Sequence, residues 1–276
     1  MAHRRNLGAM RQALVVMDGL ALDQWLLIER RLRSRRPDLL IDTRACFAWL
    51  PTLTGVSRQA IFAGEQPRAF AKSVGNTAGE PLGWRRFWEN ENLDANDVYY
   101  AKGLGQPGSC RGVIDGPIAD GVEIIGIVVD TVDRILHGET FGKRSMRRRI
   151  EEWLTFGEWD LLVDRLIAAD YQIIITSDHG NVEAVGMGVP VEGSLAEERG
   201  ERVRIYDSEV LRQRYLASNS GTKALQPGGL PESYRPLFAP YGCAFLPTQT
   251  TAVTHGGTAM EEVIVPFVRV SRKESE

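Results

Sequence analysis

Three aspartates follow short apolar runs of the chain, where their carboxylates could act together. These are Asp18 after residues 13–17, Asp130 after residues 124–129, and Asp178 after residues 172–176. Continuous apolar runs of this length are typical of strands buried on both faces. Because parallel strands end at one edge of a sheet, we expect the three carboxylates to converge there. Crowded carboxylates repel each other, and a divalent cation between them would remove that cost.

Histidines accompany these acidic segments. His179 follows Asp178 directly, and His255 lies in the turn His255-Gly256-Gly257. Three of the four histidines fall in such segments, and only His3 does not. Mixed Asp and His ligation suits zinc or manganese, and magnesium where carboxylates dominate. The sequence therefore predicts a metal centre assembled from distant segments.

The segment 130–137 has the pattern of a helix start with polar residues on one face. Asp130, Asp133 and His137 are spaced at i, i+3 and i+7, which places them on the same side of a helix. One interpretation is that all three face the predicted metal centre. The other is that Asp130 or Thr131 caps the helix while Asp133 and His137 are solvated.

A threonine loop supplies candidate nucleophiles. Thr52 and Thr54 stand at the start of a short helix predicted within residues 50–64. A hydroxyl at a helix N-terminus lies near backbone N–H groups that also favour a bound phosphate. A bound metal would make such a hydroxyl easier to deprotonate. The alternative is an ordinary threonine N-cap.

The elements that position these residues alternate along the chain. Strands are predicted at 13–17, 39–46, 98–101, 124–129, 172–176, 243–246 and 263–270, and helices at 22–36 and 150–169, the latter as one helix or two. Residues 185–205 are rich in glycine and charge and read as a surface excursion. Apolar strands alternating with helices predict an α/β fold with a mostly parallel central sheet. We expect an N-terminal tail over residues 1–12 and one domain over 13–276, which could belong to a longer protein.

Composition narrows the class of protein. Hydrophobic residues are 43% and charged residues 25% of the chain, as in ordinary globular proteins. The net charge of −3 does not mark the whole chain as a binder of polyanions. No segment approaches the roughly 20 apolar residues of a membrane span. Three widely spaced cysteines form no CxxC pair, which predicts a reducing, cytoplasmic setting.

A cluster of basic residues precedes the helix predicted from residue 150. Its members are Lys143, Arg144, Arg147, Arg148 and Arg149. Such a cluster could contact the phosphates of a nucleic acid. The alternative is that these side chains are solvated in the segment just before the helix.

Taken together, the motifs resemble the alkaline phosphatase superfamily, and more closely the PglZ domain. The superfamily marks are Met17-Asp18-Gly19, the Thr54 loop, Ser177-Asp178-His179-Gly180-Asn181 and His255-Gly256-Gly257. The PglZ-like stretches are 129–133, 199–206 and 255–266. The resemblance runs from about residue 14 to residue 270. It implies an alkaline-phosphatase-like three-layer α/β/α sandwich.

The resemblance also implies two divalent cations, with zinc preferred and manganese or magnesium as alternatives. One metal would be held by Asp18, Thr54, Asp178 and His179. The other would be held by Asp130, His255 and one further ligand. Much of the superfamily has a histidine four residues after the aspartate, and Arg134 stands there. Asp133 or His137 would then take its place.

The resemblance prefers Thr54 over Thr52 as nucleophile, because Thr54-Gly55-Val56-Ser57-Arg58 resembles the nucleophile motif of sulfatases. It implies hydrolysis of phosphodiesters or phosphomonoesters beside the other components of a BREX phage-defence system. The alternative is a catalytically weak scaffold that binds metal or a partner. In that role the tryptophans at 84, 88, 153 and 159 could serve docking if they were exposed.

Overall fold

The computed structural model describes residues 11–138, 141–194 and 200–273. Most of the predicted tail therefore lies outside the described residues, and its last residue, Gln12, begins strand β1 (Gln12–Met17). Within the described ranges, no helix is long and apolar enough to cross a membrane.

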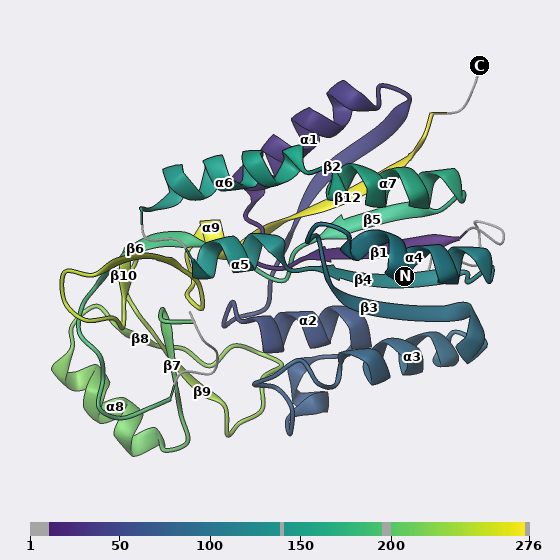
Figure 1. Ribbon diagram of the computed structural model, residues 1–276. Helices are drawn as coiled ribbons and strands as arrows, with labels where there is room; N and C mark the ends of the chain where they lie inside the picture. Colours follow the sequence, from purple (N-terminus) through teal and green to yellow (C-terminus); the bar gives the residue numbers. More distant parts are fainter. Residues whose placement is uncertain (1–10, 139–140, 195–199, 274–276) are drawn as a thin grey trace.

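A six-stranded sheet forms the centre of the molecule, in the order β2-β12-β5-β1-β4-β3 (Figure 1). The strands other than β1 are β2 (Leu39–Phe47), β3 (Val98–Leu104), β4 (Ile124–Val129), β5 (Gln172–Thr176) and β12 (Ile264–Arg272). β5, β1, β4 and β3 pair in parallel. β12 is antiparallel to both β2 and β5. The predicted mostly parallel sheet is confirmed, with one antiparallel strand inserted between two parallel ones.

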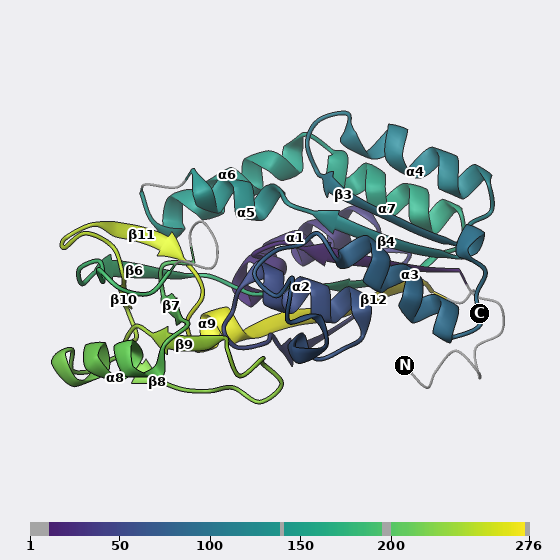
Figure 2. The same cartoon turned by 90° about the horizontal axis from the view of Figure 1, so that it is seen from below.

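Helices cover both faces of this sheet (Figures 1 and 2). One face carries α1 (Leu22–Arg35), α4 (Ser109–Ala119), α6 (Lys143–Thr155) and α7 (Glu158–Ala168). The other carries α2 (Thr54–Ala63) and α3 (Glu80–Asn90). Successive residues of β1 pack on opposite faces of the sheet. Val15 packs in the core on the side of α1, and Val16 packs in the core on the side of α2. The predicted three-layer sandwich is confirmed.

The region predicted as one or two helices over 150–169 forms two. Gly157, with φ of 80°, separates α6 from α7 in the left-handed conformation that glycine tolerates. The basic cluster was predicted to precede a helix. Instead, it forms the first half of α6 itself. The helix start predicted over 130–137 is confirmed as the short helix α5 (Thr131–His137), which begins one residue after Asp130 at the end of β4.

A smaller unit is inserted between β5 and β12. It holds two three-stranded sheets and two helices: β10-β6-β11, β7-β9-β8, α8 (Glu209–Ser218) and α9 (Met260–Val263). The strands are β6 (Val182–Gly186), β7 (Val203–Tyr206), β8 (Lys223–Ala224), β9 (Arg235–Phe238), β10 (Cys243–Ala244) and β11 (Thr251–Thr254). The surface excursion predicted over 185–205 is therefore partly wrong, because β6 and β7 reach into it. These short strands lack the long apolar runs that mark the central sheet.

The four tryptophans considered for docking are all buried. Trp84 packs edge-on against Phe62 and donates from its indole N–H to the Tyr99 carbonyl at 2.9 Å. Gly126 in β4 makes room for it, since a Cβ at that position would lie 2.8 Å from the Trp84 ring. Trp84 and Trp88 belong to the core beneath α2 and α3, and Trp153 and Trp159 belong to the core on the opposite face of the sheet. None of the four is therefore exposed for docking.

Replacing Trp84 with alanine should lower the free energy of unfolding by about 3–5 kcal/mol, because it removes a large buried ring and leaves a cavity. Urea unfolding followed by circular dichroism measures this. Leu82 lies on the same helix and is 51% exposed. Leu82→Ala is the control and should change stability by less than about 0.5 kcal/mol. Equal losses in the two variants would contradict this account of the core.

Candidate metal centre and nucleophile

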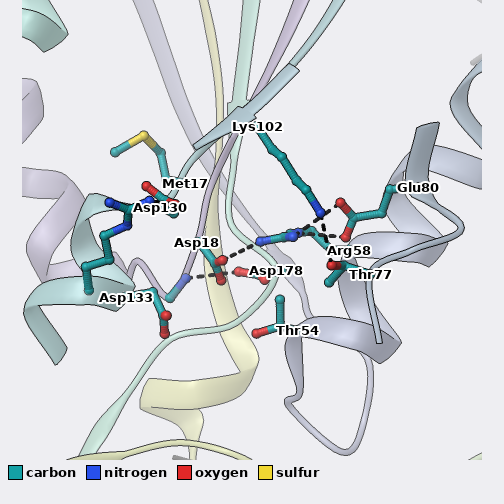
Figure 3. A network of polar contacts seen from close by, with 12 residues as sticks. Met17, Asp18, Thr54, Arg58, Thr77, Glu80, Lys102, Asp130, Asp133 and Asp178 are labelled. Carbon is teal, nitrogen blue, oxygen red and sulfur yellow. Dashed lines mark hydrogen bonds and ion pairs between the residues drawn. The ribbon is translucent and has the colours of Figure 1, made fainter. Parts of the chain in front are cut away.

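The site lies at the carboxyl edge of the central sheet. Asp18 follows β1, Asp130 follows β4, and Asp178 lies two residues beyond β5. Figure 3 shows the three carboxylates at the ends of these strands, with Thr54 below Asp178. The three aspartates at the strand ends therefore lie at one edge of the sheet, as predicted.

Asp18, Asp178 and His179 form the tightest cluster. One potential ligand atom from each lies within 4.8 Å of the others, and all three residues are buried. The Thr54 hydroxyl oxygen lies 3.1 Å from Nε2 of His179. The backbone N–H of Gly19 donates to Oδ1 of Asp178 at 3.0 Å, which fixes that carboxylate. The part of the chain described thus holds a buried Asp/Asp/His group beside a hydroxyl.

The electrostatics of this cluster are unfavourable without a cation. Oδ1 of Asp18 and Oδ2 of Asp178 are buried and have no hydrogen-bond partner. Burial and the neighbouring Asp178 charge raise the pKa of Asp18 well above its ordinary value. Burial raises the pKa of Asp178 to about 6. Orphaned carboxylate oxygens are rare in protein interiors, and a metal ion is one explanation for them.

The two buried histidines are held in the tautomer that a metal requires. Nδ1 of His179 lies 2.9 Å from the Gly180 carbonyl, and Nδ1 of His255 lies 2.9 Å from the Thr52 carbonyl. Because a carbonyl only accepts, each Nδ1 carries the proton and each Nε2 keeps its lone pair. The rings stack with centroids 3.9 Å apart. Burial, with His179 beside it, lowers the pKa of His255 to about 3, so this imidazole is neutral.

Asp133 and His137 form a second acid–imidazole pair on α5. Nε2 of His137 lies 2.8 Å from Oδ2 of Asp133. Oδ1 of Asp133 is buried without a hydrogen-bond partner and lies against Gly19, next to Asp18. Burial opposes ionisation of Asp133, but the bond to His137 and the nearby imidazoles lower its pKa. Both residues face the cluster, which the solvated alternative for this segment did not expect.

Asp130 has a different environment. Its Oδ2 accepts from Nη2 of Arg134 at 2.7 Å, while its Oδ1 is buried without a partner. Arg134 is thus an ion-pair partner of Asp130 at the position where the superfamily has a histidine.

The hydroxyls of the two candidate nucleophiles, Thr52 and Thr54, have different environments. Thr52 is fully buried, donates to the Gly257 carbonyl at 2.9 Å and accepts from the Gly256 N–H at 3.1 Å. Its hydroxyl is therefore engaged in holding the His255 turn. Thr54 is the first residue of α2 and lines a cavity of about 580 Å³ together with Asp18, Asp133, His137 and His255.

A charged network beside Asp18 was not assigned from the sequence. Arg58 donates to Oδ2 of Asp18 and, through Nε, to Oε1 of Glu80 at 2.8 Å (Figure 3). The Tyr100 hydroxyl donates to the other oxygen of Glu80. Arg58 stands in the motif quoted after Thr54, so that motif signalled its presence. Nothing in the sequence connects it to Glu80, which lies 22 residues away.

Comparison with known proteins identifies the family of this chain. A family model described as the BREX system PglZ alkaline phosphatase-like domain matches residues 3–270. The chain belongs to the PglZ family. A search of curated proteins found no match.

Solved structures show the same fold at low identity. Murine ectonucleotide pyrophosphatase/phosphodiesterase 5 is 11% identical, with a TM-score of 0.63 over 95% of this chain and 88% of that chain. An inactive threonine-to-alanine variant of that enzyme, in complex with AMP, is 12% identical and has a TM-score of 0.65. Phosphonoacetate hydrolase from Sinorhizobium meliloti 1021 is 12% identical, with a TM-score of 0.60 over 95% of this chain and 90% of that chain. The predicted alkaline-phosphatase-like fold of this PglZ domain is confirmed.

The raised pKa values of Asp18 and Asp178 predict how the metal-stripped domain responds to pH. Carboxyls whose pKa is raised by folding stabilise the fold below their unfolded pKa of about 4, and this contribution is lost as pH rises through the folded pKa. After EDTA treatment, Asp178→Asn should therefore be more stable than the wild type at pH 7.5, by a few degrees in Tm. The difference should shrink towards pH 4. Differential scanning calorimetry measures it, with Glu89→Gln on the surface as the control. A wild type that stays more stable than Asp178→Asn at pH 7.5 would contradict the predicted repulsion.

Proposed function

We propose that this PglZ domain is a metal-dependent phosphoesterase with Thr54 as its nucleophile. The observation that carries the proposal is the set of buried, unpaired oxygens on Asp18 and Asp178, grouped with His179 beside the Thr54 hydroxyl. Each carboxylate has partners for one oxygen only, and a cation would satisfy the other. A hydroxyl next to such a group is placed to become a nucleophile.

In the described residues, the donor atoms of Asp18, Asp178 and His179 are close enough to share a cation, and we propose a second cation at a less closely grouped set of ligands. We assign one to Asp18, Thr54, Asp178 and His179. We assign the other to Asp133, His137 and His255. Carboxylate and imidazole donors, with each buried Nδ1–H held by a backbone carbonyl, are typical of zinc sites, and manganese or magnesium are alternatives. When bound, such ions lower the pKa of a hydroxyl and neutralise charge on phosphoryl oxygens.

The second set uses an aspartate–histidine pair that begins three residues after Asp130. Asp133 and His137 are four residues apart, as the superfamily's aspartate and histidine are, whereas Asp130 is followed at that spacing by Arg134. Three residues of α-helix advance about 4.5 Å and almost complete a turn, so Asp133 faces the same side as Asp130. We therefore prefer Asp133 and His137 to Asp130 as ligands.

The chain's own groups support phosphoryl transfer. The Thr54 oxygen attacks phosphorus, the ester oxygen leaves, and water then hydrolyses the phosphothreonine. Arg58, held by Glu80, orients Asp18. Lys102 lines the same cavity and supplies a positive charge for the substrate.

The relatives favour a diester substrate but leave a monoester open. The structural neighbours are named as a pyrophosphatase/phosphodiesterase and a phosphonate hydrolase, and one is inactive when a threonine becomes alanine. Family membership places the domain in the context of a BREX phage-defence system. We propose that it acts there on phosphate esters, beside other BREX components. The scaffold alternative predicts bound metal without turnover.

Thr54→Ala should reduce hydrolysis of bis(p-nitrophenyl) phosphate by three orders of magnitude or more, because a nucleophile is lost. Thr54→Ser keeps a hydroxyl and should retain measurable turnover. Metal content, measured by mass spectrometry in each variant, is the control. The role of Thr54 is excluded by normal turnover of Thr54→Ala at full metal occupancy, and the scaffold alternative is supported by a metal-loaded wild type without turnover.

The register of the second site can be tested by metal stoichiometry. Asp133→Asn and His137→Ala should each bind one fewer ion per chain than the wild type, because each loses a ligand of that site. Asp130→Asn is the matched variant and should keep both ions. The reverse pattern, with one ion lost in Asp130→Asn only, would show that Asp130 is the ligand.

A further inference from the structure

A second cavity lies next to the catalytic cleft. It has a volume of about 340 Å³ and lies between the loop after β3, helix α5 and helix α6. Arg134 lines both this cavity and the catalytic cleft, so the two spaces meet at its side chain. Of the five basic residues considered for nucleic-acid binding, only Arg149 lines either space.

The wall of this cavity contains a buried hydroxyl without a partner. Thr131 is 3% exposed, and its Oγ1 has no hydrogen bond. Gly105, which also lines the cavity, packs directly against this oxygen, since a Cβ there would lie 2.3 Å from it. Gly105 has φ of 101°, a conformation that few other residues adopt. The hydroxyl is therefore covered, and the charged side chains of the lining decide what the cavity can bind.

The charges of the lining are mostly positive. Arg134 and Arg149 contribute guanidinium groups, and Glu152 is the one carboxylate among the described lining residues. Nη1 of Arg149 donates to the Ile135 carbonyl at 3.3 Å, which anchors the side chain at the cavity wall. Trp153 and Phe156 provide an apolar side, with Phe156 58% exposed. Guanidinium groups are typical ligands of phosphate, which they bind through paired N–H donors.

We propose that this cavity is a subsite for a second phosphate of the substrate, held between Arg134 and Arg149. The inference rests on the proposed phosphoesterase function and names its substrate class: a phosphate ester that carries a further phosphate beyond the scissile one. The ester is cleaved at Thr54 while the second phosphate occupies the subsite. The carbon framework between the two phosphates passes Arg134.

The test compares two chromogenic esters that differ only in the second phosphate. The p-nitrophenyl ester of thymidine 5′-phosphate has one, and the same ester with an added 3′-phosphate has two. We expect the added phosphate to raise kcat/KM by roughly tenfold, as expected for one charge-assisted contact. Arg149→Gln should remove this preference. Arg148→Gln, one residue earlier on α6 and outside the cavity, should keep it, and Glu152→Gln should increase it.

Turnover of bis(p-nitrophenyl) phosphate, which has no second phosphate, should be the same in Arg149→Gln as in wild type. Equal kcat/KM for the two thymidine esters in wild type, or an equal preference in the Arg148 and Arg149 variants, would overturn the subsite while the proposed function stood. If no ester were hydrolysed, the proposed function would fail instead. Calorimetric binding of thymidine 3′,5′-bisphosphate then decides: weaker binding in Arg149→Gln than in Arg148→Gln supports the subsite, and equal binding overturns it.

Discussion

The repulsion between the buried carboxylates of Asp18 and Asp178 is the constraint around which this end of the molecule is organised. Together with Asp133 and Glu80, they make four carboxylates, and Arg58 is the one guanidinium that contacts any of them in the residues described. The buried histidine His255 is neutral and cannot balance the excess. In a dry site such an excess is costly, and cations offset it. Thr54 gains its proposed chemistry from its position beside that charge.

The inserted unit between β5 and β12 completes the site from the other side. His255 reaches it on the turn after β11, which Thr52 and Glu262 hold in place. Glu262 accepts from the Gly257 and Ala259 N–H groups at 2.7 and 3.0 Å and from Nε of Arg202 at 3.0 Å. Two PglZ-like stretches, 199–206 and 255–266, therefore meet through one buried ion pair. The backbone N–H of Arg202 also donates to the His255 carbonyl at 3.1 Å, so this pair stabilises the turn that carries His255.

The acid–imidazole pair Asp133–His137 lies about one helical turn after Asp130, and this position also affects Arg134. With Asp133 and His137 facing the cluster, Arg134 turns away from it and pairs with Asp130 at the rim. Its guanidinium then borders both cavities. In the proposed arrangement, Asp133 and His137 of α5 bind a metal ion, while Arg134 of the same helix contacts the substrate.

The sequence by itself determined the central sheet and the residues at its edge. Long apolar runs are buried on both faces whatever surrounds them, so β1, β4 and β5 and the acids after them were predictable from local pattern. The pairing of Asp133 with His137, rather than solvation, depended on which face of α5 packs inwards. The resemblance already preferred Thr54 to Thr52 as nucleophile, and the tertiary structure adds that the Thr52 hydroxyl is engaged by the His255 turn. The contact of Arg58 with Glu80, and the cavity beside Arg149, join segments far apart in the chain. Such contacts are set by packing between layers, for which no local periodicity exists, and only the tertiary structure decides them.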